Sequence, residues 1–333
     1  MKRSVEILGD ETFEITEGGH LAILEEIDLF ICALGYEQRS SFVAKSSTLG
    51  EYSKIALAFP NEYSLSYNNN KSFLSGRGFN IVDYEAGKLE ELLISELEKN
   101  LPLEKETVHV FIDISSMSRP MIAKIVFVLS NLNIETDIKI TFSYCPAVFS
   151  KPNHENAPVT KSEPVIPEFA GWSLAPEASI STIIGIGFEY DWALGALEYL
   201  EPETAWAFVP TGEDDRFDHV VKQTNADLLA LLDDDHIHFY PVYQPASCFT
   251  FVENLVYGLK QNTRPILVPF GPKLFTLVCL LAAVIHEPLI TVWRVSGDSE
   301  SYPDDRQASG RVVIMQVAMS MIDANSIIGN NDL

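Results

Sequence analysis

The sequence feature that most constrains the fold is a series of apolar, β-branched runs that alternate with helix-forming segments. This alternation is typical of parallel sheets with helices on both faces. The series runs along the chain twice, because Gly187 follows Gly35 by 152 residues and Pro210 follows Pro60 by 150, with equivalent features between them in the same order. The sequence therefore predicts an α/β protein of two tandem Rossmann-like units, each with a mostly parallel sheet flanked by helices.

Prolines mark the predicted boundary between the two units. They recur from Pro146 to Pro176 in a stretch with little periodicity, which is typical of an ordered connection on the surface. We therefore predict a Rossmann-like domain over residues 1–150, a proline-rich connection over residues 151–179 and a second, divergent Rossmann-like domain over residues 180–333. Within the last range, residues 310–321 form a β-rich run that is expected to add an edge strand or a terminal element.

Composition restricts the partners of the protein. The formal net charge is −24, which repels nucleic-acid backbones and anionic membranes. We expect no direct binding to duplex nucleic acid and no membrane association, whereas a local site for a small phosphorylated ligand, or a basic protein partner, is compatible with this charge. The four cysteines lie among apolar neighbours and no signal-peptide pattern opens the chain. These features predict a soluble, cytoplasmic protein.

The strongest candidate site lies within residues 108–131. A buried-strand run ends at Asp113, a small polar turn follows, and a helix is expected to begin near Pro120. In an open α/β sheet such a turn lies at the carboxyl end of a strand and the amino end of a helix, where ligands bind. Backbone N–H groups, hydroxyls and a guanidinium at this place suit an anion. The alternative is an ordinary capped turn between a strand and a helix.

The turn after the first buried strand is the predicted second wall of this site. If the two strands are neighbours, Arg39 and Arg119 would clamp a phosphate, a tyrosine would stack on a base, and Glu37 and Asp113 would accept hydrogen bonds from ribose or base. The alternative is that these carboxylates pair with the arginines as structural salt bridges. The predicted ligand-binding residues of the first half are Gly35, Tyr36, Glu37, Arg39, Ser40, Asp113, Ser115, Ser116, Ser118 and Arg119.

The second half carries a related pair of turns with a single cation. Its predicted ligand-binding residues are Gly187, Glu189, Gly271 and Lys273. They could bind a second anion or complete the first pocket across a pseudo-twofold axis. The alternative, slightly favoured from the sequence, is a degenerate copy that is retained for packing.

Other motifs give no catalytic or metal site. Carboxylates and imidazoles lie close together at residues 233–238, but this segment follows a leucine-rich helix and is predicted to be a solvated turn. There is no G-x-S-x-G elbow, no P-loop and no G-x-G-x-x-G after a strand. We therefore predict no metal and no cofactor, and name no catalytic residue.

Residues 112–121, with the sequence IDISSMSRPM, resemble the ligand-loop motif of CRISPR-associated Rossmann-fold (CARF) domains. In that motif an Asp or Asn, a Thr or Ser, a small Gly-containing turn and a Lys or Arg precede a helix; in this sequence Met117 stands where the family usually has Gly. The resemblance implies a Rossmann-like sensor of cyclic oligonucleotides, with Ser115, Ser116, Ser118 and Arg119 near the ligand. It also implies a place in a bacterial anti-phage defence system.

These observations predict a sensor or regulatory protein that binds a nucleotide or another phosphorylated small molecule and has a protein partner. Two alternatives stay open. One is an enzyme acting on a nucleotide or sugar phosphate, with Glu37 or Asp113 as acid or base and Arg39 and Arg119 as phosphate clamps. The other is a scaffold subunit that offers its acidic surface to a basic protein.

Overall fold

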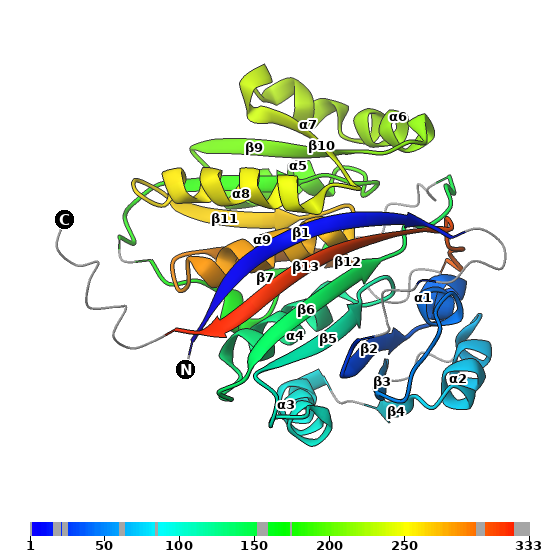
Figure 1. The fold of residues 1–333 in the computed structure, drawn as a ribbon. Helices are drawn as coiled ribbons and strands as arrows, with labels where there is room; N and C mark the ends of the chain where they lie inside the picture. Colours follow the sequence, from blue (N-terminus) through cyan, green and yellow to red (C-terminus); the bar gives the residue numbers. More distant parts are fainter. Residues whose placement is uncertain are drawn as a thin grey trace.

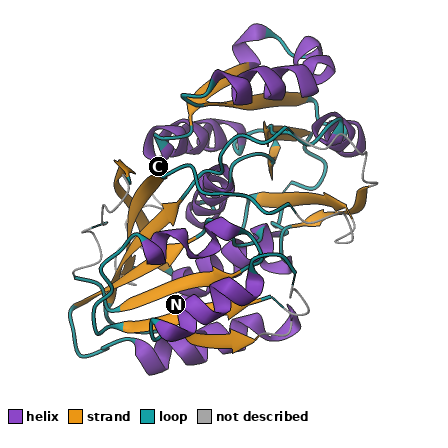
Figure 2. Cartoon of the chain, turned by 90° about the vertical axis from the view of Figure 1, so that its right-hand side faces the viewer, coloured by secondary structure: helices purple, strands orange, loops and turns teal. Residues whose placement is uncertain are grey.

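The computed structural model describes residues 2–15, 21, 26–59, 64–83, 86–151, 159–173, 175–297 and 304–322. Pro60, which helped to define the predicted repeat, lies outside this part of the chain, as do residues 152–158 of the predicted connection. Two sheets carry the fold, with helices packed between and around them (Figures 1 and 2).

The first sheet has seven strands in the order β1-β13-β6-β5-β2-β3-β4. Its strands are β1 (Arg3–Glu14), β2 (Leu29–Leu34), β3 (Ser53–Ala58), β4 (Asn80–Asp83), β5 (Thr107–Asp113), β6 (Asp137–Tyr144) and β13 (Arg311–Met321). The strands from β2 to β6 are parallel, whereas β13 is antiparallel to both β6 and β1.

The second sheet has six strands in the order β10-β9-β8-β11-β12-β7. Its strands are β7 (Val159–Pro164), β8 (Ile180–Gly185), β9 (Thr204–Thr211), β10 (Ile237–Pro241), β11 (Arg264–Pro269) and β12 (Thr291–Gly297). All neighbours are parallel except β7, which is antiparallel to β12.

Both sheets reverse their strand order at the same relative place. In the first sheet β3 and β4 lie on one side of β2, and β5 and β6 lie on the other; β8 divides the second sheet in the same way. Each sheet therefore has a topological switch point, between β2 and β5 and between β8 and β11, where ligands bind in open α/β folds. The predicted α/β architecture with two mostly parallel sheets is confirmed.

The sheets do not follow the predicted division of the chain strictly. β13 belongs by sequence to the second half, yet it hydrogen bonds into the first sheet between β1 and β6. β7 lies in the predicted proline-rich connection and forms an edge strand of the second sheet. The boundaries at residues 150 and 180 stay a prediction, because pairing between strands far apart in sequence decides which sheet a strand joins.

The helices are α1 (Phe42–Lys45), α2 (Tyr67–Gly76), α3 (Leu89–Asn100), α4 (Arg119–Asn131), α5 (Trp192–Leu200), α6 (Asp215–Thr224), α7 (Ala226–Leu231), α8 (Pro245–Leu259) and α9 (Lys273–Ile285). Helix α9 is buried at every position from Leu274 to Val284, as expected for a helix that is apolar on all sides. It packs against α4, and both helices belong to one apolar core that includes strands of both sheets. Among the described residues, no helix is long and apolar enough to cross a bilayer.

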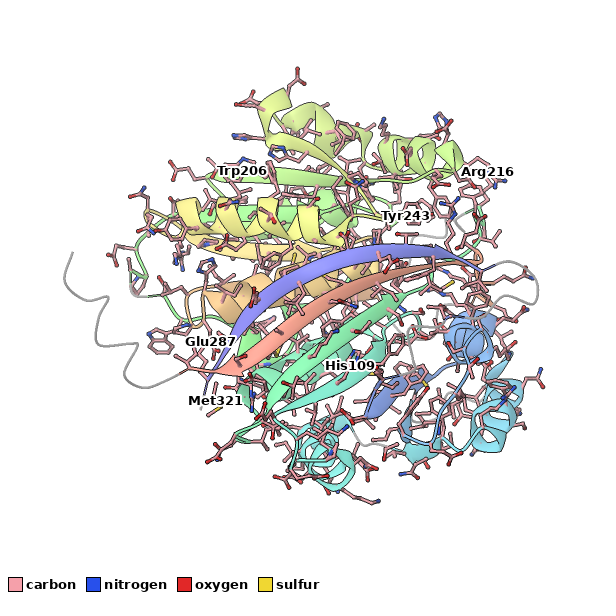
Figure 3. The ribbon with its side chains drawn as sticks, viewed as in Figure 1. His109, Trp206, Arg216, Tyr243, Glu287 and Met321 are labelled. Atoms are coloured by element: carbon pink, nitrogen blue, oxygen red, sulfur yellow. The ribbon has the colours of Figure 1, made fainter. Side chains whose placement is uncertain are left out.

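The carboxyl ends of the two sheets point toward the same end of the molecule. In Figure 3, Trp206 lies near the start of β9, and Arg216, which follows that strand, lies at the right-hand end of the view. Met321, the last residue of β13, lies at the opposite end. Because β6 is antiparallel to β13, β6 and its parallel neighbours also end toward the right. The two switch points therefore open in the same direction.

Candidate functional site

The first switch point brings the two turns of the first half together. β2 pairs directly with β5, with Cys32 opposite Asp113, so the turns that follow these strands are neighbours. A Cβ atom placed on Gly35 would lie 3.4 Å from the Ser116 Cβ. Residues 35–41 and residues 113–119 thus form two sides of one place at the edge of the sheet.

Several polar side chains of the first turn form hydrogen bonds and an ion pair that stabilise the turn. Arg39 is only 3% exposed, and its Nε lies 2.5 Å from Glu37 Oε2 while its Nη1 donates to the Cys145 carbonyl at 3.0 Å. Ser40 Oγ donates to the Ala33 carbonyl and accepts from the Gly35 N–H. These contacts correspond to the salt-bridge alternative for Arg39 and Glu37, because a guanidinium held in this way has little surface for a ligand.

The side chain of Tyr36 is partly buried and packs against an apolar core cluster that includes Phe30 and Val43. Its carbonyl accepts from the Ser66 N–H at 3.0 Å. The turn therefore also fixes the backbone around the predicted stacking residue.

The second turn is ordered by Asp113. Its Oδ1 accepts from the Ser115 hydroxyl at 2.5 Å and from the Ser115 N–H at 3.0 Å, and the Ser115 Oγ accepts in turn from the Cys145 N–H. Burial raises the pKa of Asp113 to about 6, against the lowering effect of these hydrogen bonds and of nearby Arg39 and Lys273. Ser118 caps α4 by accepting from the Met121 N–H. Asp113, Ser115 and Ser118 therefore shape the turn.

At the second switch point two glycines allow the turns after β8 and β11 to approach each other closely. A Cβ atom on Gly187 would lie 2.6 Å from the Gly271 Cα. Gly271 has φ +70°, and a Cβ atom there would lie 2.3 Å from the Ile186 carbonyl oxygen. Only glycine fits such an approach and such a backbone conformation. The ends of β8 and β11 are thereby held close together.

The two switch points meet each other across the molecule. Arg119, the first residue of α4, donates through Nη2 to the Gly271 carbonyl at 3.2 Å. Lys273, the first residue of α9, donates through Nζ to the Ser115 carbonyl at 2.7 Å. In each half, the side chain of the first residue of a helix therefore donates a hydrogen bond to a backbone carbonyl of the other half. This contact fits a single joint site and also the alternative of a copy retained for packing, because both side chains donate to backbone carbonyls.

A further cation lies beside the site and was not found from the sequence. The Arg306 carbonyl accepts from the Arg39 N–H at 3.2 Å, and the adjacent Asp305 carboxylate accepts from the Gln38 N–H at 2.7 Å and from the Ser66 hydroxyl at 3.0 Å. No signal in the sequence pointed to Arg306, because it follows the second sheet in the chain and reaches the first switch point only through tertiary packing.

Four cations, Arg39, Arg119, Lys273 and Arg306, influence one another at this junction. Burial and the neighbouring guanidinium groups of Arg39, Arg306 and Arg119 lower the pKa of Lys273 to about 7, against the raising effect of Glu37. The pKa of Glu37 is itself lowered, because Lys273, Arg39 and Arg306 outweigh its burial. The carboxylates of Glu37, Asp113, Glu189 and Asp305 lie among these cations. The junction is therefore less acidic than the chain as a whole, whose net charge is −24, and its cations are the groups that an anion would contact.

Three buried polar atoms at the junction have no hydrogen-bond partner among the described residues. They are Ser116 Oγ, Arg119 Nε and Glu189 Oε2. Buried polar groups are normally paired, since an unmade hydrogen bond costs free energy. Two of these atoms, Ser116 Oγ and Arg119 Nε, are donors at the start of α4, where an ordered water or a bound anion can accept from them.

Aromatic rings adjoin the second turn. Phe188 stacks on Phe217 with ring centroids 5.6 Å apart, and Phe149 meets Phe217 edge-on at 5.1 Å. The Arg216 guanidinium lies 4.9 Å from the centre of the Phe149 ring. Phe188 directly precedes Glu189, so these rings lie next to the junction.

The described residues contain no group of His, Cys, Asp and Glu side chains that could hold a metal ion. In the acidic segment considered above, residues 234–236 form a short 3₁₀ turn in which the His236 N–H donates to the Asp233 carbonyl. The His236 ring packs 4.6 Å from Trp206.

The chain was compared with protein families, curated proteins and solved structures. No family model matches the chain, and no curated protein matches it either. Among solved structures, the cytoplasmic domain of a prokaryotic cation chloride cotransporter is similar at 10% sequence identity with a TM-score of 0.24, covering 83% of this chain and 97% of that one.

Proposed function

We propose that this protein is a sensor or regulatory protein that binds a nucleotide or another phosphorylated small molecule where its two switch points meet. The observation that carries the proposal is the pair formed by Arg119 and Lys273, which begin two packed helices in different halves and reach across to each other's turns. Two helix starts and two cations at one place favour an anion with several oxygens.

We further propose that the protein acts with a protein partner in a bacterial anti-phage defence system. This part rests on the resemblance of residues 112–121 to the CARF ligand loop. The net charge of −24 supports a basic partner, because complementary charge speeds and orients association.

Binding is favoured over catalysis because the two carboxylates that could act as acid or base are held in contacts within the protein. Asp113 is 3% exposed and holds the Ser115 turn, and Glu37 pairs with Arg39. A general acid or base must reach the proton that it transfers. Both carboxylates are instead engaged in shaping the site.

The test is a calorimetric titration of the protein with ATP, pyrophosphate, a sugar phosphate and cyclic oligonucleotides. We expect at least one to bind to the wild type, and Arg119→Ala to abolish that binding because its guanidinium faces the site. The matched control is Arg77→Ala, which removes an exposed arginine that follows α2 and should bind as the wild type does. Absence of binding by every compound, or equal loss in both variants, would contradict the proposal.

A further inference from the structure

We infer that Glu189 is an internal competitor for the ligand: its carboxylate lies against Arg119 where an anion would bind, and it moves away when the anion arrives. This inference rests on the proposed function and changes the role of Glu189 from a ligand contact to a residue that sets the strength of anion binding. It is argued from how poorly the carboxylate is accommodated where it lies.

The ion pair between Glu189 and Arg119 is loose. Glu189 Oε1 lies 3.4 Å from Arg119 Nη2, whereas charge-assisted hydrogen bonds between such groups are commonly about 2.7–2.9 Å. An arginine and a carboxylate often form two parallel bonds, but here Arg119 Nε and Glu189 Oε2 are both buried without a partner among the described residues. The carboxylate therefore leaves part of the guanidinium unused.

The same carboxylate is folded back over its own turn. A Cβ atom on Gly187 would lie 2.3 Å from Glu189 Oε2, so only the absence of a side chain at Gly187 lets the carboxylate take this position. The Glu189 side chain is 26% exposed, which gives it a route to solvent. A buried, unpaired oxygen with access to water gains hydration when it leaves.

A phosphate suits this place better than the carboxylate does. Arg119 Nε and the Ser116 hydroxyl are buried donors without partners, and both belong to the turn that begins α4. A phosphate offers three strong acceptor oxygens to such donors, where the carboxylate now makes one long contact. Glu189 thus keeps the Arg119 charge partly compensated until an anion replaces it.

If Glu189 competes with the ligand, its substitution should strengthen anion binding and not weaken it. Substitution of a residue that contacts the ligand weakens binding, whereas removal of an internal competitor strengthens it. Glu189→Gln keeps the size of the side chain and removes its charge. The matched control is Glu163→Gln, which removes one negative charge from β7, where Glu163 pairs with Arg294.

The experiment measures pyrophosphate affinity by calorimetry for the wild type, Glu189→Gln and Glu163→Gln, together with the melting temperature of each protein without pyrophosphate. We expect Glu189→Gln to bind about tenfold more tightly, since a like charge close to the anion is removed in a partly screened setting. Glu163→Gln should bind as the wild type does. Binding by Glu189→Gln where the wild type shows none would also support the inference.

Other results would distinguish failure of the competitor role of Glu189 from failure of the proposed anion site. Equal or weaker binding by Glu189→Gln, with binding by the wild type, overturns the competitor role and leaves the anion site in place. A lower melting temperature in that case would assign Glu189 to holding the halves together. If neither protein binds pyrophosphate, and the wild type binds no compound of the wider panel, the proposed function fails and this inference fails with it.

Discussion

The cations of the site differ in what their side chains contact, although all of them stand in similar polar turns of the sequence. Arg39 is enclosed by Glu37 and the Cys145 carbonyl, whereas Arg119 and Lys273 reach across the molecule. The sequence could predict the turns, because a polar segment after a buried strand marks the carboxyl end of that strand. It could not separate a structural arginine from an accessible one, since their partners come from distant segments.

We expect Lys273 to make the proposed anion binding depend on pH. Its pKa is lowered to about 7, so an appreciable fraction of the amine is neutral at physiological pH. An anion binds to the charged form and raises its pKa, so affinity should increase as pH falls from about 8 to about 6. Lys273→Arg stays charged throughout this range, so we expect its affinity to lack the increase that protonation of Lys273 causes.

The measurement is the ratio of pyrophosphate affinities of the wild type and Lys273→Arg, determined by calorimetry at several pH values. The titration of pyrophosphate itself affects both proteins and cancels in the ratio. We expect the ratio of the wild-type affinity to the variant affinity to increase as the pH is lowered. A ratio that does not change with pH would contradict the role of Lys273.

The elements of each half follow from local sequence patterns, but the way the halves are joined does not. Apolar runs predicted the strands from β2 to β6 and from β8 to β12. The pairing of β13 with β6 and β1 could not be predicted, because antiparallel partners about 170 and 310 residues away leave no local signal. β1 also packs against α8 and α9 (Figure 1), so this strand pair ties the second half to the first.

Arg3 ties this strand pair to the segment between α4 and β6. It is 1% exposed, and its guanidinium donates to the carbonyls of Leu132, Ile134, Thr136 and Met319. Arg3→Met keeps an unbranched side chain but leaves these carbonyls without their donor. We expect it to lower the free energy of unfolding by about 2–4 kcal/mol.

Urea denaturation followed by circular dichroism measures this change. Arg77→Met, at an exposed arginine that follows α2, is the control and should alter the free energy of unfolding by less than about 0.5 kcal/mol. An effect of Arg3→Met no larger than that of the control would show that Arg3 does not stabilise the strand pair.

At the scale of the whole molecule, the two halves share one core and one junction. A single apolar cluster contains Ile112 and Val126 of the first half together with Leu277 and Val292 of the second. The switch points are joined by the contacts of Arg119 and Lys273. The duplication was visible in the sequence, but the meeting of its two copies depends on the packing of α4 against α9, which no spacing of residues reveals.

We propose that both halves together build one anion site, and the number of pyrophosphate molecules bound per chain tests this. Calorimetry on the wild type, Arg119→Ala and Lys273→Met should give one site per chain for the wild type and no binding for either variant, because each variant removes one side of the same site. Two sites per chain, or variants that each lose only half of the binding, would contradict a joint site and assign an independent one to each half.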